Sequence, residues 1–148
     1  MSALKPLLAN HHEHCDALFA EAEQAANTAQ WSDCEARFQA FVEALDAHFR
    51  AEEEVLFPAF EAATGMSGGP TAVMRGEHAQ MRALVEAIQA AVSARDADEF
   101  FGSCETLVIF MEQHNRKEEG ILYPMCDDRI PQAQAMADQL EQRLGATA

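Results

Sequence analysis

The sequence contains one short pattern twice, and this repeat limits the folds that the chain can adopt. Residues 48–58 read HFRAEEEVLFP and residues 114–124 read HNRKEEGILYP, so both follow His-x-Arg-x-Glu-Glu-x-(Val/Ile)-Leu-aromatic-Pro. The second copy begins 66 residues after the first. Around each copy, apolar residues recur at intervals of three and four, which is the period of one face of an α-helix. The chain therefore predicts two similar helical units.

Each copy places a histidine and a glutamate one helical turn apart on the apolar face. The pairs are His48 with Glu52 and His114 with Glu118. A carboxylate on a buried stripe is costly unless a partner satisfies it. One such pair is equally well explained by a buried His–Glu hydrogen bond, but two pairs at matched positions favour a shared partner. A metal ion is the simplest partner of that kind.

The same offset connects a third pair of histidines, because His12 aligns with His78 and the residues after them also agree. Each unit thus offers one histidine from its first helix and a His-x-x-x-Glu from its second. His11 and His14 are alternatives to His12, but the repeat favours His12, and we expect the other two at the surface or rim. The candidate metal ligands are His12, His48, Glu52, His78, His114 and Glu118.

The periodicity predicts an all-α fold with a single domain over residues 1–148. Helices are expected at about 3–27, 32–63, 71–93 and 97–126, with a short tail helix at about 132–144. The first four form an up-down-up-down four-helix bundle over about residues 3–128, built from two repeated hairpins. The tail helix packs across the bundle or on a partner, and the second position would give a homodimer.

Local signals refine these helices. Residues 32–35 form a capping-box pattern, and Asp96 with Glu99 is a second start signal. Pro58 falls inside the second helix, where it should kink the helix or end its regular part. Tyr123 occupies the aromatic position of the repeat, and we expect a packed ring with its hydroxyl at the rim. Glu53, Glu54 and Glu119 are expected to be solvated or to orient ligating histidines.

Composition excludes several classes of partner. The formal net charge is −15, with 25 acidic and 10 basic residues, which argues against nucleic acid and anionic membrane surfaces. No apolar stretch is long enough to span a bilayer, and the first residues lack the layout of a signal peptide. The 4 cysteines are scattered without a C-x-x-C pair. We therefore expect a cytoplasmic protein with reduced thiols.

Six ligands are too many for one tetrahedral zinc site and suit two metal ions. Two carboxylates can each bridge both ions, and the histidines divide between them. Histidine and carboxylate ligands with open positions are the preference of non-haem iron, although manganese or zinc can occupy such a site in vitro. The expected cofactor is two iron ions about 3.5–4 Å apart with a solvent-derived oxo or hydroxo bridge.

The sequence resembles the hemerythrin-like, HHE cation-binding family from about residue 4 to residue 126. The matching positions are His12, His48, Glu52, Glu77, His78, His114 and Glu118. The resemblance implies a four-helix bundle around a non-haem di-iron centre, and chemistry with oxygen, peroxide or nitric oxide, or iron handling. Oxygen-carrying members have a further histidine one turn from the position of His78, where this chain has Met74 and Arg82.

Three functions follow from these observations. The first is a small sensor or stress-response protein that binds or reacts with oxygen species or nitric oxide, so its partner is a diatomic or peroxide ligand. The second is an iron-storage or reversible oxygen-binding module without turnover. The third is a metal-free interaction bundle, which has little use for six such groups in matched positions.

Overall fold

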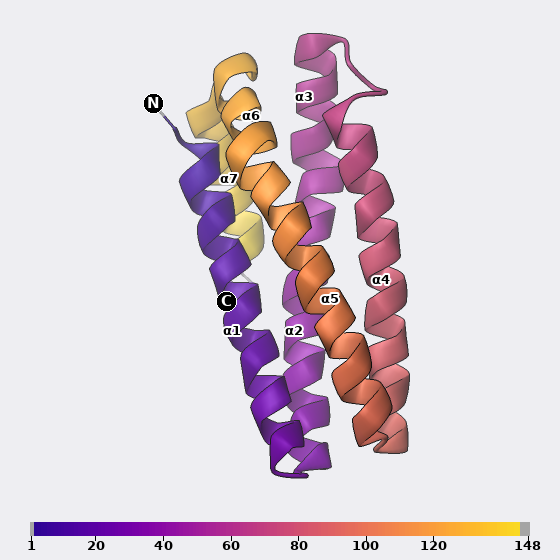
Figure 1. Ribbon diagram of the computed structural model, residues 1–148. Helices are drawn as coiled ribbons and strands as arrows, with labels where there is room; N and C mark the ends of the chain where they lie inside the picture. The colour runs from indigo at the N-terminus through magenta and orange to yellow at the C-terminus, as the bar shows by residue number, and fades with distance from the viewer. Residues whose placement is uncertain (1, 146–148) are drawn as a thin grey trace.

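The protein is all-α across residues 2–145, which are the residues that the computed structural model describes. The long helices stand side by side as rods, and a short C-terminal helix lies against them (Figure 1). The elements are α1 (Leu4–Asn27), α2 (Trp31–Ala51), η1 (Glu52–Leu56), α3 (Phe57–Thr64), α4 (Pro70–Ala94), α5 (Ala97–Lys117), η2 (Glu118–Leu122), α6 (Tyr123–Arg129) and α7 (Ala133–Gly145). The predicted fold class is confirmed.

The rods are arranged as two hairpins. Helix α1 pairs with the rod formed by α2, η1 and α3, and α4 pairs with the rod formed by α5, η2 and α6. The tail helix α7 packs against α1 and α2, where Ala137 and Leu140 are buried. Packing across the bundle is one of the two positions expected for it, and a homodimer through this helix stays a prediction. None of the helices described between residues 2 and 145 combines the length and apolar character that a membrane span needs.

Two predicted helix starts have different outcomes. The Asp96 side chain accepts a hydrogen bond from the Glu99 N–H at 3.1 Å, so this cap of α5 is confirmed. The prediction of a capping box at residues 32–35 is wrong, because α2 already begins at Trp31 and no side chain caps it. The preceding turn is closed by the backbone instead: Ala29 has a positive φ of 57°, and the Gln30 N–H bonds the Ala25 carbonyl at 2.9 Å.

Both copies of the repeated motif contain a π-helical turn at the same place. In η1 the Phe57 N–H bonds the Glu52 carbonyl, and in η2 the Tyr123 N–H bonds the Glu118 carbonyl, five residues earlier in each case. A π turn holds one residue more than an α turn and is frequent at functional sites. It also brings the aromatic residue back over the glutamate, a position that an α-helical period does not predict.

The prolines of the repeat follow these turns. The regular α-helix ends at Ala51, before Pro58, which agrees with the prediction, but a helix resumes at Phe57. Because Pro58 has no N–H, it cannot donate to the carbonyls of the preceding turn. The Glu53 carbonyl accepts a hydrogen bond from Arg75 Nη1 at 3.4 Å instead.

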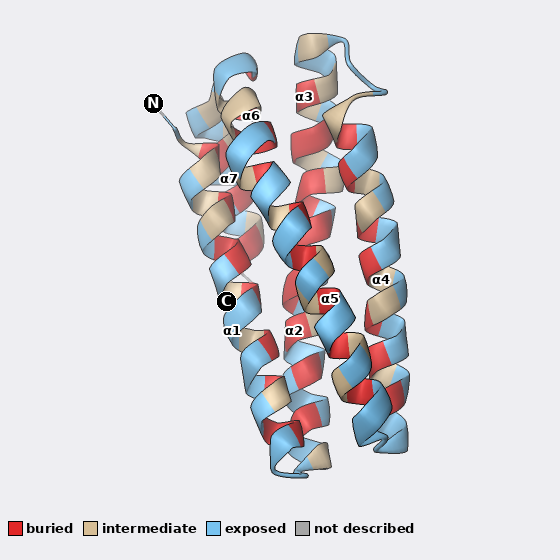
Figure 2. Ribbon diagram, in the orientation of Figure 1, coloured by how far each residue is buried: buried red, intermediate tan, exposed pale blue. Residues whose placement is uncertain are grey.

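Buried apolar side chains form two separate clusters along the bundle. One contains residues such as Phe19, Phe41 and Met81, and the other contains residues such as Leu8 and Phe60. Figure 2 shows the buried positions facing inward along all four rods. On α1, α4 and the rod that contains η2, a polar stretch separates the residues of one apolar cluster from those of the other. On the rod that contains η1 the two clusters meet at Phe49 and Ala51, and His48 and Glu52 flank this point. Together these polar residues form a layer. This polar layer contains the predicted ligands.

Candidate metal centre

The six predicted ligands converge in the polar layer, although each rod contributes only one or two of them. None of these six residues is more than 6% exposed. Helix α1 positions His12, and α4 positions His78. The other two rods each supply a histidine at the end of an α-helix and a glutamate at the first residue of a π turn.

Four of these residues form a first group on the α4 side of the layer. Glu52, His78, His114 and Glu118 each offer one ligand atom, and these four atoms lie within 4.8 Å of one another. His78 Nε2 lies 3.1 Å from Glu52 Oε1, and His114 Nε2 lies 3.2 Å from Glu118 Oε1. Two imidazoles and two carboxylates therefore surround a common point.

A second group lies next to the first on the α1 side. It contains His12, His48 and Glu118, with His12 Nε2 at 3.1 Å from Glu118 Oε1. Glu52 also reaches this side, because its Oε2 lies 3.6 Å from His48 Nε2. Glu118 is thus common to both groups, and the two oxygens of Glu52 are directed to different sides. This arrangement fits two cations that share both carboxylates.

Several buried atoms of the layer have no hydrogen-bond partner in the described chain. Four of them are His78 Nε2, His114 Nε2, Glu52 Oε1 and Glu118 Oε2, one from each residue of the first group, and His11 Nε2 and His14 Nε2 also lack a partner. His78 Nε2 and Glu52 Oε1 are close but are not aligned to share a proton. Leaving such groups buried and unsatisfied costs about 1–3 kcal/mol each, and more for charged groups. A cation bound between them would satisfy all four, so the donor set fits a metal.

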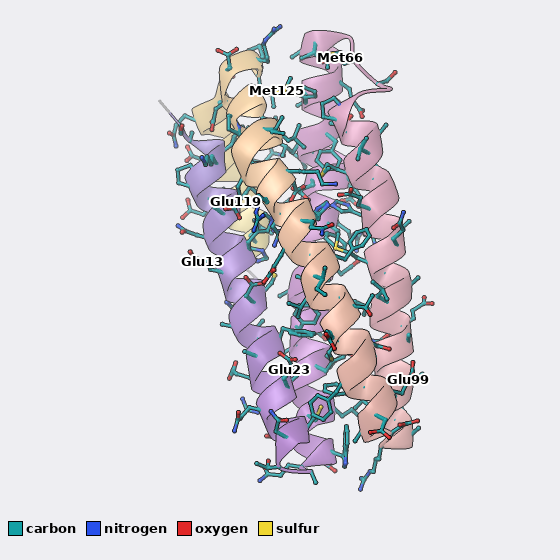
Figure 3. The ribbon with its side chains drawn as sticks, viewed as in Figure 1. Glu13, Glu23, Met66, Glu99, Glu119 and Met125 are labelled. Atoms are coloured by element: carbon teal, nitrogen blue, oxygen red, sulfur yellow. The ribbon has the colours of Figure 1, made fainter. Side chains whose placement is uncertain are left out.

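Carboxylates outside the layer hold three of the four imidazoles through Nδ1. Glu119 Oε2 lies 2.7 Å from His12 Nδ1, Glu53 Oε2 lies 2.7 Å from His78 Nδ1, and Glu77 Oε1 lies 2.8 Å from His114 Nδ1. Figure 3 shows Glu119 at the boundary between α1 and the rod that contains η2. With Nδ1–H donating outward, each Nε2 lone pair is directed to the centre of the layer.

The structure thus assigns a contact to each of the other acidic residues of the motif, which were expected to be solvated or to orient histidines. Glu53 and Glu119 orient histidines, whereas Glu54 bonds Arg50 and Arg143 at the surface. Arg82 binds Glu53 through two hydrogen bonds, of 2.7 and 3.0 Å. Glu77 is one of the positions that match the family, but it lies outside the repeated motif, so the repeat did not identify it as a support for His114.

His48 has a different support. Its Nδ1 lies 2.9 Å from His11 Nδ1, and the two rings stack with their centroids 5.0 Å apart. His11 is only 7% exposed, so the expectation that it lies at the surface or rim is wrong. Burial and the neighbouring histidines lower the pKa of His11 to about 3, and its ring is therefore neutral. When the lone pair of His48 Nε2 is directed to the centre of the layer, the ring proton is on Nδ1, and this N–H donates to His11 Nδ1.

Tyr123 also lies inside the layer, and the expected position of its hydroxyl at the rim is wrong. The residue is fully buried, and its hydroxyl donates to Glu52 Oε2 at 2.6 Å. The hydroxyl also lies 2.9 Å from Glu118 Oε1. The π turn of η2 explains this inward position, because it rotates Tyr123 back over Glu118.

The charges of the layer favour a bound positive charge. Burial lowers the pKa of His12, but hydrogen bonding and attraction to Glu118 outweigh burial and raise that pKa to about 9. Burial would raise the pKa of Glu52, but the charge of His48 and the surrounding hydrogen bonds hold it well below its usual value. Protons can supply the positive charge in the metal-free chain, and a metal can replace them.

The four cysteines take no part in the layer. All are buried and unpaired. Cys15 is the nearest to the layer in sequence, and its Sγ lies 3.8 Å from His11 Nδ1. Burial, followed by the charges of Asp16 and Glu52, raises the pKa of Cys15 to about 12, so the thiol stays protonated. It packs as a small apolar side chain.

The fold and the site together define a helical-bundle protein with a buried histidine–carboxylate site for metal cations. The family model for the hemerythrin HHE cation binding domain matches residues 5–126, and the chain belongs to this family. Neither the curated proteins nor the solved structures gave a match.

Proposed function

We propose that His12, His48, Glu52, His78, His114 and Glu118 hold two iron ions. The observation that carries this proposal is the set of four buried atoms without hydrogen-bond partners, one from each residue of the first group. The adjacent second group, which shares Glu118, supports a second ion. Iron suits the donor set better than zinc, because imidazole and carboxylate ligands with open coordination positions are typical of non-haem iron sites.

The ligand that this centre binds is a small oxygen species or nitric oxide. A di-iron pair supplies redox chemistry and open positions for an outside ligand. Where oxygen carriers have a further histidine, Met74 is buried in the apolar core and Arg82 binds Glu53, so neither adds an imidazole to the first group. The near-complete burial of the six side chains suits a diatomic or peroxide ligand. We propose a role in sensing or in the response to oxidative or nitrosative stress.

The first experiment is metal analysis and visible spectroscopy of protein produced with ample iron and purified in air. The expected result is two irons per chain with absorption typical of an oxo- or hydroxo-bridged pair. The Glu52→Ala variant should lose this absorption, whereas Glu54→Ala, which changes an exposed neighbour, should keep it. A colourless protein without stoichiometric metal would overturn the proposal and favour a metal-free interaction bundle.

Titration with nitric oxide and with peroxide then separates reaction from storage. Consumption of either molecule, with a change in the iron spectrum, supports the proposed role. If neither is consumed, the alternative is an iron-storage or reversible oxygen-binding module without turnover. A stable and fully reversible oxygen adduct of the reduced protein would identify the oxygen-binding form of that alternative.

A further inference from the structure

Tyr123 is the only tyrosine of the chain, and its hydroxyl oxygen is surrounded by candidate ligand atoms. The nearest are Glu52 Oε2 at 2.6 Å and Glu118 Oε1 at 2.9 Å. His12 Nε2 lies at 3.2 Å and His48 Nε2 at 3.3 Å. The hydroxyl thus contacts both carboxylates and both imidazoles on the α1 side of the layer.

These distances match those between ligands of one ion. Atoms that each bind a common ion at about 2.1 Å lie roughly 3 Å from one another when they are adjacent in its coordination sphere. The phenol oxygen has this separation from all four atoms. It therefore lies where a further ligand of the same ion would lie.

We propose that Tyr123 binds, as a phenolate, the ion held by His12, His48 and the two carboxylates. This inference rests on the metal centre of the proposed function. In the metal-free chain the phenolic proton is donated to Glu52. On coordination the oxygen–proton bond is replaced by an oxygen–metal bond, and the proton leaves to solvent.

The proposal makes the two ions different although the chain is built from a repeat. Phe57 is the repeat equivalent of Tyr123, and it stacks on His78 with ring centroids 5.6 Å apart. Phe57 carries no oxygen, so it cannot supply a ligand to the first group. The ion on the α1 side therefore has one anionic ligand more from the protein than its neighbour.

The test is resonance Raman spectroscopy of the iron-loaded chain, excited in its visible absorption band. A phenolate bound to ferric iron gives a charge-transfer band and enhanced ring vibrations. Because the chain has a single tyrosine, incorporation of ring-deuterated tyrosine labels Tyr123 alone. The expected result is that the enhanced vibrations shift in the labelled protein. This measurement uses the unmodified chain, so it does not depend on whether a variant folds.

The Tyr123→Phe variant supplies the second measurement, since phenylalanine already occupies the equivalent position in the other unit. It should bind two irons and lose the phenolate band. The double variant Tyr123→Phe/Phe110→Tyr is the matched control, because it restores a tyrosine on α5 at a partly buried position beside the other apolar cluster. This control should also lack the band.

Two failures can be told apart. Two irons per chain without phenolate vibrations in the unmodified protein would show that Tyr123 stays a neutral phenol, which overturns this inference and leaves the proposed function intact. Absence of stoichiometric metal would overturn both. Retention of the band in Tyr123→Phe would also overturn the assignment to this residue.

Discussion

Among the four imidazoles of the polar layer, His48 alone is supported by another imidazole. A carboxylate that accepts the Nδ1–H makes a ligating histidine more basic, and such supports commonly contribute a factor of 10–100 to metal affinity. The neutral His11 accepts the same hydrogen bond without a negative charge. His48 is thus a weaker electron donor than His12, His78 or His114. It lies on the same side of the layer as the Tyr123 hydroxyl.

We predict that His11→Ala weakens metal retention. Without the His11 ring, His48 loses the group that fixes its tautomer and the ring that stacks on it. The iron-loaded variant should release metal to a chelator about 10-fold faster than the unmodified protein, in line with the loss of a supporting hydrogen bond. His14→Ala is the control, since His14 contacts His11 but none of the six ligands is its neighbour in the ring contacts of the structure. Equal release rates for both variants would contradict the prediction.

At the scale of single residues, the sequence predicted the six candidate ligands that the fold brings together in the layer, but it misplaced two of their neighbours, Tyr123 and His11. In an α-helix, Tyr123 would lie about 140° around the axis from Glu118, away from the centre. The π turn removes most of that rotation, and the α-helical period contains no signal for it. His11 is covered because α7 packs on α1, and the packing of a tail helix cannot be read from local sequence. For Tyr123, the available sequence signal was that the only tyrosine of the chain occupies the aromatic position of the repeat, where the first copy has Phe57.

At the scale of elements, helix α1 begins with a cap that comes from the other end of the chain. Asp127, in α6, accepts hydrogen bonds from the N–H groups of Ala3 and Leu4 through Oδ1, at 2.9 and 2.8 Å. Its Oδ2 accepts a third from the Lys5 N–H at 3.1 Å. A negative charge at a helix N-terminus also interacts favourably with the helix dipole. This contact fastens α1, which carries His12, to α6, which carries Tyr123.

Asp127→Ala should therefore destabilise the whole bundle. The variant leaves three N–H groups without their acceptor, and loss of a helix cap typically costs about 1–2 kcal/mol. The expected change is a fall in the urea midpoint at unchanged slope, with two metals still bound. Asp128→Ala removes the adjacent aspartate, whose side chain is 78% exposed, and should have little effect. A loss of stability in Asp128→Ala equal to that in Asp127→Ala would refute the capping role.

The helices differ in how far sequence alone could place them. Apolar periodicity located the long helices because each buries one continuous face, and Asp96 marked a start because its cap is local. The start of α2 was misplaced because backbone hydrogen bonds and Ala29 close the turn, so the apparent capping box is unused. A cap such as Asp127 is also invisible in sequence, since residues 3–5 and 127 are brought together only by the fold.

At the scale of the whole molecule, the polar layer interrupts the hydrophobic core. Two apolar clusters stabilise the ends of the bundle, while the six candidate ligands lie buried between them, together with His11 and Tyr123. The repeat predicted this layer because both units place histidine and glutamate at equivalent heights. A chain with buried groups that lack partners is expected to gain stability when a ligand supplies the missing interactions.

The last prediction is that metal binding stabilises the entire fold. At free metal about 100 times its dissociation constant, a single bound ion adds about 2.7 kcal/mol to the free energy of unfolding. Anaerobic thermal unfolding with ferrous iron and with chelator should therefore give clearly different midpoints. Glu52→Gln should remove most of that difference, because it removes a carboxylate that reaches both groups, whereas Glu54→Gln should preserve it. Identical midpoints with and without metal in the unmodified chain would mean that the unsatisfied atoms of the layer do not bind a cation.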